Sequence, residues 1–439
     1  MPELDRDPEA LAACADDWGH MVSRTPRAVA RPSSVDEVVA TVRAAREEGV
    51  PVVARGRGHA MAGDAQVEDG IVIDMSRLDR AEAVEGDSVW VEAGASWQDL
   101  FEAVYPEGMA PRVVPHYPKL SIGGVLCGAG VGIASVRHGL ATDTVTEMDV
   151  VTGEGEVLRC SAQERPDLFE AVRGGLGQTA IIVRARIVVE PVPERLVETV
   201  LTYGDLEVFF DALRRAAAHP ETWGLLGMVG MDEAGRPVGA LYADLPGGPE
   251  SDTAVAHLAE ALPPPVTGPD SYELTYLEHF GAMAAVEERY RTTTDYWDRL
   301  HPWFGVILSP GEIAGYLEEH LADIVESEGR GRLGNAVVYV IGGRAEGAGG
   351  APLPEGDPVF GFSDNGGFPA TPENATWAGE RNRRLYEAAR RRGGTLGPFG
   401  YMPMEAPDWE AHFGDRWADL VEAKRRYDPD GVLARDLSR

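Results

Sequence analysis

The sequence predicts a protein of mixed α-helices and β-strands that folds into two or three domains. Its 439 residues are too many for one ordinary hydrophobic core. The first third alternates short apolar runs with segments of helical periodicity, and this pattern changes at Pro191 and Pro193. These observations place a domain boundary near residue 195, with a different mixture of helices and strands beyond it.

The first element with clear local signals is a helix between Ser34 and Gly49. Ser34 and Glu37 have the spacing of a capping box, and valines recur behind them at helical spacing. Gly49 is a typical helix stop, and the apolar run 50–53 after it predicts a short buried strand. The chain therefore enters the glycine-rich segment PVVARGRGHAMAGDAQ, residues 51–66, at the end of a helix–strand unit.

The remaining elements follow from the same periodicities. Strands are predicted at 70–76, 88–96, 180–191, 223–231 and 335–343, and a hairpin at 145–160 around Gly153, Glu154 and Gly155. Helices are predicted after Ser96 and at 166–174, 205–218, 311–326 and 417–429. Residues 344–376 are rich in glycine and proline and predict long loops.

Composition excludes several classes of protein. A net charge of −32 without a basic cluster argues against a nucleic-acid partner. No apolar run approaches the roughly 18 residues of a membrane span, and the acidic N-terminus lacks the basic region of a signal peptide. The three cysteines, Cys14, Cys127 and Cys160, form no C-x-x-C pair. We therefore expect a cytoplasmic protein without a metal site, a membrane partner or a nucleic-acid partner.

Three glycine-bearing segments precede residue 180: 56–63, 123–132 and 174–177. Glycines let successive backbone N–H groups converge into anion-binding nests that suit a pyrophosphate. Residues 175–180 match the G-x-G-x-x-[GA] dinucleotide fingerprint, which requires a strand before it and a helix after it. Here a helix precedes and a strand follows, so we reject a Rossmann site.

His59 stands directly after the first glycine turn, where two interpretations are open. A lone histidine often only hydrogen-bonds a loop. A neutral imidazole in a turn suited to cofactor phosphates is also a nucleophile for an activated flavin methyl group.

The segment GRGHAMAG, residues 56–63, resembles the GRGHS segment of the vanillyl-alcohol oxidase superfamily, which has a PCMH-type FAD-binding fold. Cytokinin dehydrogenase-like and berberine-bridge-like oxidoreductases are the most similar branches. Further similar segments follow in the same order: 121–139, 145–161, 167–191, 301–310 and 408–434. The resemblance covers both ends of the chain and part of the middle.

The resemblance implies a two-lobed α+β fold. The FAD-binding domain would comprise residues 1–195 and a C-terminal return at 393–439. Residues 196–392 would form a substrate-binding domain whose antiparallel sheet covers the flavin. FAD would be linked through its 8α carbon to His59. Some relatives carry a second link to a cysteine six residues before the paired glycines; that position is Tyr117 here, and Cys127 does not match it, so we expect one link.

The resemblance also implies which residues contact the cofactor. The predicted set is Arg55, Gly56, Arg57, Gly58, His59, Ala60, Asp64, Ala65, Ser121, Gly123, Gly124, Gly128, Ala129, Val131, Gly132, Ile181 and Ile182. Asp143 and Thr144 would lie near the adenine and ribose, or would simply cap a turn.

The substrate residues depart from the family pattern. Cytokinin dehydrogenases place an aspartate a few residues before the paired glycines, and His116 stands there in this chain. A histidine can act as a general base near neutral pH, or it can be a polar wall residue. Glu287 and Glu288 match an acidic residue of the family, and we select Glu288 as the catalytic candidate. Tyr401, where the chain re-enters the FAD domain, is the third candidate, although packing is an equally good interpretation.

We therefore predict an FAD-dependent oxidase or dehydrogenase acting on a small organic substrate. A hydride would leave a C–H next to an amine or alcohol, and O₂ or another electron carrier would accept the electrons. Arg55, Arg57, Arg137 and Arg184 would supply local positive charge. The alternative is a flavin-dependent cyclase or multi-step tailoring enzyme in small-molecule biosynthesis.

Overall fold

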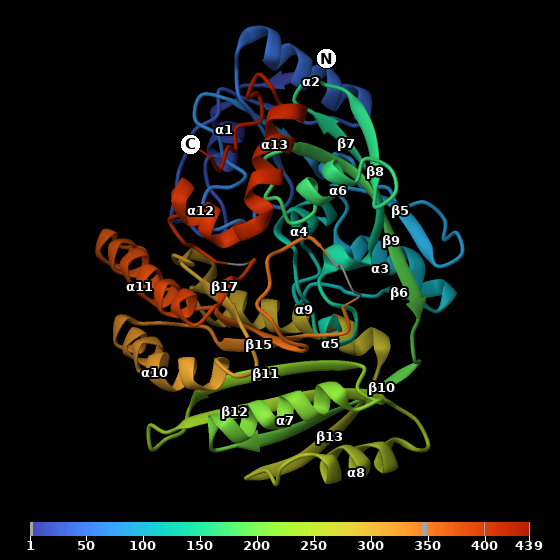
Figure 1. The fold of residues 1–439 in the computed structure, drawn as a ribbon, viewed down its shortest axis with the longest axis vertical. Helices are drawn as coiled ribbons and strands as arrows, with labels where there is room; N and C mark the ends of the chain where they lie inside the picture. The colour runs from blue at the N-terminus through green and yellow to red at the C-terminus, as the bar shows by residue number, and fades with distance from the viewer. Residues whose placement is uncertain (1–2, 345–348, 399, 439) are drawn as a thin grey trace.

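In the computed structural model, which describes residues 3–344, 349–398 and 400–438, the chain forms an upper and a lower lobe (Figure 1). The upper lobe contains both ends of the described chain, and the middle of the chain forms the lower lobe. No helix in the described ranges is long and apolar enough to cross a bilayer. The mixed α+β architecture agrees with the predicted fold class.

The upper lobe contains two sheets. In the first, the order is β1-β2-β4-β3, and β4 pairs in parallel with both β2 and β3. In the second, the antiparallel order is β5-β9-β7-β8, with β6 pairing to the far end of β9. The strands are β1 (Leu4–Asp5), β2 (Ala28–Ala30), β3 (Val52–Arg55), β4 (Ile71–Asp74), β5 (Ser88–Glu92), β6 (Met109–Pro111), β7 (Val145–Thr152), β8 (Val157–Ser161) and β9 (Ala180–Pro191).

Helices accompany these two sheets, and most of them share one apolar core with the strands, except that α1 packs in a smaller cluster and Val136 of α5 packs in the core of the lower lobe. They are α1 (Pro8–Cys14), α2 (Val35–Glu48), α3 (Trp97–Val104), α4 (Ile122–Gly128), α5 (Ser135–His138), α6 (Pro166–Val172), α12 (Ala406–Phe413) and α13 (Trp417–Tyr427). The last two come from the C-terminal part of the chain, and α13 packs against α6. The two ends of the sequence therefore build one lobe.

The lower lobe is built on an antiparallel sheet of order β13-β10-β12-β11-β15-β16-β14-β17. Its strands are β10 (Arg195–Tyr203), β11 (Gly224–Met231), β12 (Pro237–Pro246), β13 (Thr267–Thr275), β14 (Phe304–Leu308), β15 (Ala336–Ile341), β16 (Val359–Asp364) and β17 (Thr395–Leu396). Its helices are α7 (Leu206–Ala218), α8 (Ser251–Ala261), α9 (Tyr276–Thr293), α10 (Ile313–Glu326) and α11 (Pro372–Arg391).

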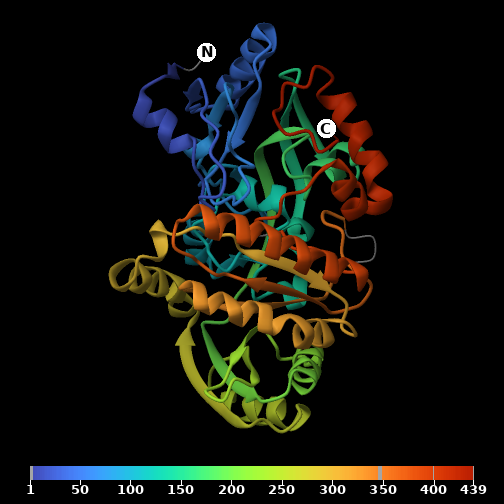
Figure 2. The same cartoon turned by 90° about the vertical axis from the view of Figure 1, so that its left-hand side faces the viewer.

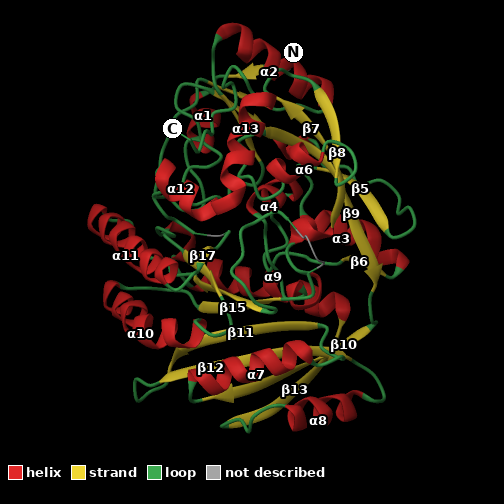
Figure 3. Cartoon of the chain, in the orientation of Figure 1, coloured by secondary structure: helices red, strands yellow, loops and turns green. Residues whose placement is uncertain are grey.

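The two faces of this sheet have different neighbours. Side chains from α7, α8, α10 and α11 form one core with one face of the sheet, hereafter the lower face. Figure 3 shows α7 in front of β12, and Figure 2 shows α10 and α11 running side by side. The upper face carries Val337, Tyr339 and Ile341 of β15, which pack with Ala129, Val131 and Leu140 of the upper lobe. The upper face is therefore the surface that meets the glycine-rich loops.

Most local predictions are confirmed. Ser34 caps α2 through its side chain, Gly49 ends it in the left-handed region, and Ser96 forms a capping box at α3. The Glu37 carboxylate differs from the prediction, because it accepts the N–H and hydroxyl of Ser33 instead of the N–H of Ser34. The long loop predicted for 344–376 is wrong in part: it contains β16 and the start of α11, while residues 345–348 lie outside the described ranges.

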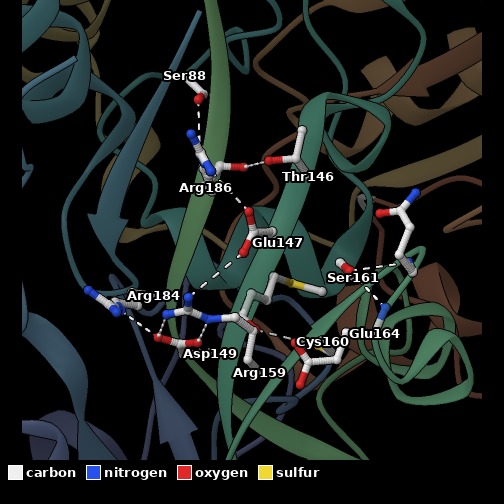
Figure 4. A network of polar contacts seen from close by, with 12 residues as sticks. Ser88, Thr146, Glu147, Asp149, Arg159, Cys160, Ser161, Glu164, Arg184 and Arg186 are labelled. Atoms are coloured by element: carbon white, nitrogen blue, oxygen red, sulfur yellow. Dashed lines mark hydrogen bonds and ion pairs between the residues drawn. The ribbon is translucent and has the colours of Figure 1, made fainter. Parts of the chain in front are cut away.

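The exposed side of the β7–β9 region carries a ladder of ion pairs (Figure 4). Asp149 of β7 accepts from Arg159 of β8 and from Arg184 of β9, and Glu147 accepts from Arg186. Both Arg159 and Arg184 also lie over the ring of Trp90. Arg184 is thus neutralised in this ladder, and its predicted contribution to a positive pocket is wrong.

Candidate flavin site

The first glycine turn follows β3, which ends at Arg55, and it presents a row of backbone N–H donors. None of the amides from Arg57 to Ala62 has a hydrogen-bond acceptor within the described part of the chain. The Nη1 atom of Arg55 is buried without a partner there, while its Nη2 donates to the carbonyl of Ala13. Gly58 has a φ of 70°, which only glycine adopts cheaply. This donor set fits a buried polyanion such as a pyrophosphate.

The second glycine segment packs directly against the first. A Cβ on Gly56 would lie 1.9 Å from the Oγ of Ser121, the residue that precedes α4. The predicted glycines Gly123, Gly124 and Gly128 lie in α4, and Ala129 ends it with a φ of 56°. Val131 and Gly132 continue the chain toward the upper face of the lower-lobe sheet, so the two predicted segments form one continuous surface.

His59 lies among aromatic rings at the edge of this surface. Its imidazole stacks on Trp18, with ring centroids 5.0 Å apart, and its centroid is 4.8 Å from that of Tyr117. Burial lowers the pKa of His59 to about 4, and nearby Glu287 opposes that shift. The imidazole is therefore neutral near pH 7, the form required of a nucleophile.

Glu287, not Glu288, faces this site from α9. Glu287 is 7 % exposed and accepts from Lys119 at 2.7 Å, Arg291 at 2.8 Å and the Tyr117 hydroxyl at 3.2 Å. These partners, above all the hydrogen bond from Lys119, hold the pKa of Glu287 below its usual value although burial alone would raise it. Glu288 points to solvent one residue later, so the choice of Glu288 is corrected.

A small cavity adjoins Tyr117 and Glu287. It has a volume of about 120 Å³, lies between α3 and α9, and its lining includes Tyr117, Lys119 and Glu287 together with Phe101 and Phe280.

His116 lies between the lobes. Its ring makes an edge-to-face contact with Tyr339 of β15, at 6.2 Å between centroids. Burial, followed by the neighbouring His279 of α9, lowers the pKa of His116 to about 4. The ring is thus neutral near pH 7 and can accept a proton, although as a weaker base than an ordinary histidine.

Other predicted residues have structural partners. Asp64, which precedes Ala65 in the same turn, forms an ion pair with Arg435. Asp143 accepts a hydrogen bond from the backbone N–H of Leu140 and forms an ion pair with Arg344. Asp143 thus caps a turn, as one of its two interpretations held. The side chains of Ile181 and Ile182 lie in the upper-lobe core on β9.

Three more predicted residues are placed as follows. Arg137 pairs with Glu190 and lies over Trp223. Arg57 forms an exposed ion pair with Asp99. Tyr401 is half-buried and packs in the cluster that contains Trp18.

Sequence reasoning missed Asp17 and Trp18. Asp17 is 4 % exposed and accepts the amides of Gly19 and Gly63, which ties the N-terminal segment to the glycine turn. Trp18 lies on both His59 and His301, at 5.0 Å and 4.1 Å between centroids. The only available signal was the segment DDWGH, which matches no general motif.

Comparisons with known proteins agree with this geometry. A family described as FAD binding domain matches residues 26–161, and a family described as cytokinin dehydrogenase 1, FAD and cytokinin binding, matches residues 249–437. An uncharacterised oxidoreductase of the fasciation locus of Rhodococcoides fascians is 31 % identical over 97 % of this chain and 96 % of its own. Cytokinin dehydrogenase 1 of Oryza sativa subsp. japonica is 30 % identical over 98 % and 90 %.

A solved structure shares the fold. The 6-hydroxy-D-nicotine oxidase of Arthrobacter nicotinovorans superposes with a TM-score of 0.77 over 99 % of this chain and 96 % of its own, at 22 % identity.

Fold, donor set and relatives together define an FAD-dependent oxidoreductase. The chain belongs to the cytokinin dehydrogenase family, within the vanillyl-alcohol oxidase superfamily that its motifs resemble.

Proposed function

We propose that this enzyme holds FAD by a single covalent bond from His59 and oxidises a C–H bond next to an amine or alcohol of a small molecule. The observation that carries the proposal is the imidazole of His59, kept neutral by burial, within the run of unsatisfied amides from Arg57 to Ala62. Arg55 and these amides would neutralise the pyrophosphate. Bound FAD supplies the acceptor for the hydride, and O₂ or another carrier takes the electrons.

The residues of the chain divide the remaining work. His116 would accept the proton from the substrate heteroatom, because its ring lies between the glycine-bearing lobe and Tyr339 of the covering sheet. Glu287 would orient Tyr117 beside His59, and it replaces Glu288 in the proposed site. The names of the relatives, cytokinin dehydrogenase and 6-hydroxy-D-nicotine oxidase, both specify nitrogen compounds and support an amine as the substrate.

We also propose the domain limits from the sheets. The FAD-binding part would end between β9 and β10, near residue 195, and resume after β17, which still pairs with β14. The proposed return therefore begins a few residues later than the predicted 393.

Acid precipitation tests the covalent bond. Yellow colour that stays in the pellet supports the histidyl link, and His59→Ala should move the colour to the supernatant. His257→Ala is the matched control, because His257 is exposed on α8. If wild-type protein releases all its flavin into acid, the covalent assignment is abandoned.

Anaerobic mixing with amines and alcohols tests the reaction class. An oxidase or dehydrogenase bleaches its flavin once with its substrate, whereas a redox-neutral cyclase forms product without bleaching. Product without bleaching would therefore overturn the proposed reaction while leaving the flavin site intact.

A further inference from the structure

Two carboxylates lie opposite each other on the upper face of the lower-lobe sheet. Glu198 of β10 and Asp244 of β12 are register partners in an antiparallel pair. Like charges in this position destabilise a sheet, so their presence requires a compensating interaction. Asp244 is 4 % exposed, whereas Glu198 remains partly exposed.

The sheet leaves space beside Asp244. Its partner on the other neighbouring strand is Gly224 of β11. A Cβ on Gly224 would lie 2.5 Å from the Oδ2 of Asp244 and 3.3 Å from the side chain of Ile133. The Asp244 carboxylate therefore lies where the side chain of any larger residue at position 224 would have to go. It also lies next to the second glycine segment.

His279 of α9 completes a set of three acceptors. Its Nε2 is 3.3 Å from the Oδ2 of Asp244, and one atom from each of Glu198, Asp244 and His279 lies within 4.8 Å of the other two. Among the described residues, no lysine or arginine forms a hydrogen bond or ion pair with either carboxylate. The acidic pair, with Asp244 buried and Glu198 partly exposed, therefore has no lysine or arginine partner among these residues, and its neighbour is His279.

We propose that Glu198, Asp244 and His279 form a subsite for the ammonium group on a second, cationic end of the substrate. This inference rests on the proposed function, because it assigns the substrate class to the same site. The geometry matches the ligand: a primary ammonium has three donors, and Glu198, Asp244 and His279 can each present one acceptor atom, His279 doing so when its proton is on Nδ1. A cationic tail would also neutralise part of the buried negative charge.

The position of the cluster connects it to the reacting centre. His279 is close enough to His116 to contribute to the lowered pKa of that ring. Tyr339, which contacts His116, lies on the same face of the sheet as the cluster, because Leu226 is its register partner and Leu226 is two residues from Gly224. In the proposal, a substrate whose reacting end lies at His116 would extend its other end along this face toward Asp244.

The surroundings favour an organic cation over a metal ion. Tyr272 of β13 is the register partner of Glu198, and Tyr242 lies two residues from Asp244 on the same strand face. Burial raises the pKa of Tyr276 to about 12, and Glu190 and then Asp244 add to this shift. Aromatic side chains around carboxylates are typical of sites for organic ammonium groups. Two carboxylates and a histidine can also hold a transition metal, so the experiment includes metal binding as an outcome.

The test uses the flavin-loaded enzyme and linear diamines of three to eight carbons, each paired with the amino alcohol of the same length. Binding is measured by perturbation of the flavin absorbance and by calorimetry, so no turnover is needed. At least one diamine should bind about tenfold or more tightly than its amino alcohol. Glu198→Gln and Asp244→Asn should remove this preference. Glu273→Gln, on the exposed ion pair with Arg195, should keep it.

A second variant keeps the test decisive if Asp244→Asn fails to fold. Glu198→Lys supplies an internal ammonium, so it should fold, retain FAD and lose the preference for diamines. Equal affinity for both members of every pair, or a preference that survives Glu198→Gln, overturns the subsite. Uptake of one equivalent of Zn²⁺ or Mn²⁺ also overturns the subsite, if Glu198→Gln abolishes the uptake and diamines do not displace the metal.

The two proposals fail separately. If diamines bind through Glu198 but product forms from them without bleaching the flavin, the subsite stands and the proposed reaction class is overturned. If amines bleach the flavin but the enzyme shows no preference for a second positive charge, the proposed reaction stands and the subsite is overturned.

Discussion

The indole of Trp18 stacks on the imidazole of His59, with ring centroids 5.0 Å apart and planes inclined by 20°. This contact fixes the plane of the ring that we propose to carry the flavin. Trp18→Leu should therefore lower the fraction of FAD that remains with the acid-precipitated chain, while Trp18→Phe should largely retain it. Flavin absorbance in pellet and supernatant measures both fractions.

Loss of stability must be separated from loss of orientation. Truncating a buried tryptophan costs about 3–5 kcal/mol at the extreme, so melting temperatures accompany the flavin assay. A Trp18→Leu protein with wild-type covalent FAD would show that stacking is not needed for the link.

Glu287 and its neighbour form a matched pair for mutation. Glu287→Gln removes the charge that Lys119 and Arg291 face, and it should cost about 1–3 kcal/mol of stability and raise KM. Glu288→Gln changes an exposed side chain on the same helix and should remain within about 0.5 kcal/mol of wild type. Denaturant unfolding and steady-state kinetics would distinguish them, and equal effects would contradict the assignment of Glu287.

The proposed base predicts an unusual pH profile. Burial and His279 lower the pKa of His116 to about 4, and Tyr339 is its aromatic neighbour from the covering sheet. A base must be unprotonated, so kcat at saturating substrate should rise through an inflection near pH 4 and stay level above it, without one near 6.5. His279→Ala should move the inflection upward, because it removes one cause of the shift.

His116→Gln provides the complementary result. Loss of a general base costs about 10²–10⁴-fold in rate, so kcat should fall by that factor with unchanged FAD content. Retention of wild-type kcat would remove His116 from the mechanism.

The sequence predicted elements whose signals are local. The cap at Ser34, the stop at Gly49 and the full length of β9 follow from short-range rules that the packed protein obeys. β16 was missed because glycines and prolines surround a short apolar run. That run becomes a strand only because β14 and β15 flank it on both sides.

The glycine turns that we propose for the flavin have a local sequence signal, whereas the residues that we propose for the substrate do not. The glycine spacing around His59 is a local signal for a turn, because the backbone geometry of the turn limits which residues fit. The choice between Glu287 and Glu288 depends on which face of α9 meets Lys119, and no local signal specifies that face. Glu198, Asp244 and His279 come from three separate segments that only sheet register and helix packing bring together.

Asp244 makes the folded protein less stable as pH rises. Burial raises its pKa from 3.8 to about 7, so between these values the folded chain holds a proton that the unfolded chain has lost. Unfolding then releases a proton, and the free energy of unfolding falls with rising pH by up to about 1.4 kcal/mol per pH unit. The titrating groups that face Asp244 are Glu198 from β10 and His279 and Tyr276 from α9, and all three remain in Asp244→Asn.

The variant isolates this contribution. Asp244→Asn should gain stability relative to wild type as pH rises from 5 to 8, whatever constant offset the amide introduces. Asp270→Asn, an exposed substitution on β13, should show no such change. Denaturant unfolding at several pH values gives both differences. A difference between Asp244→Asn and wild type that stays constant across this range would mean that the pKa of Asp244 is not raised in the folded protein, which is the state that a bound diamine should produce.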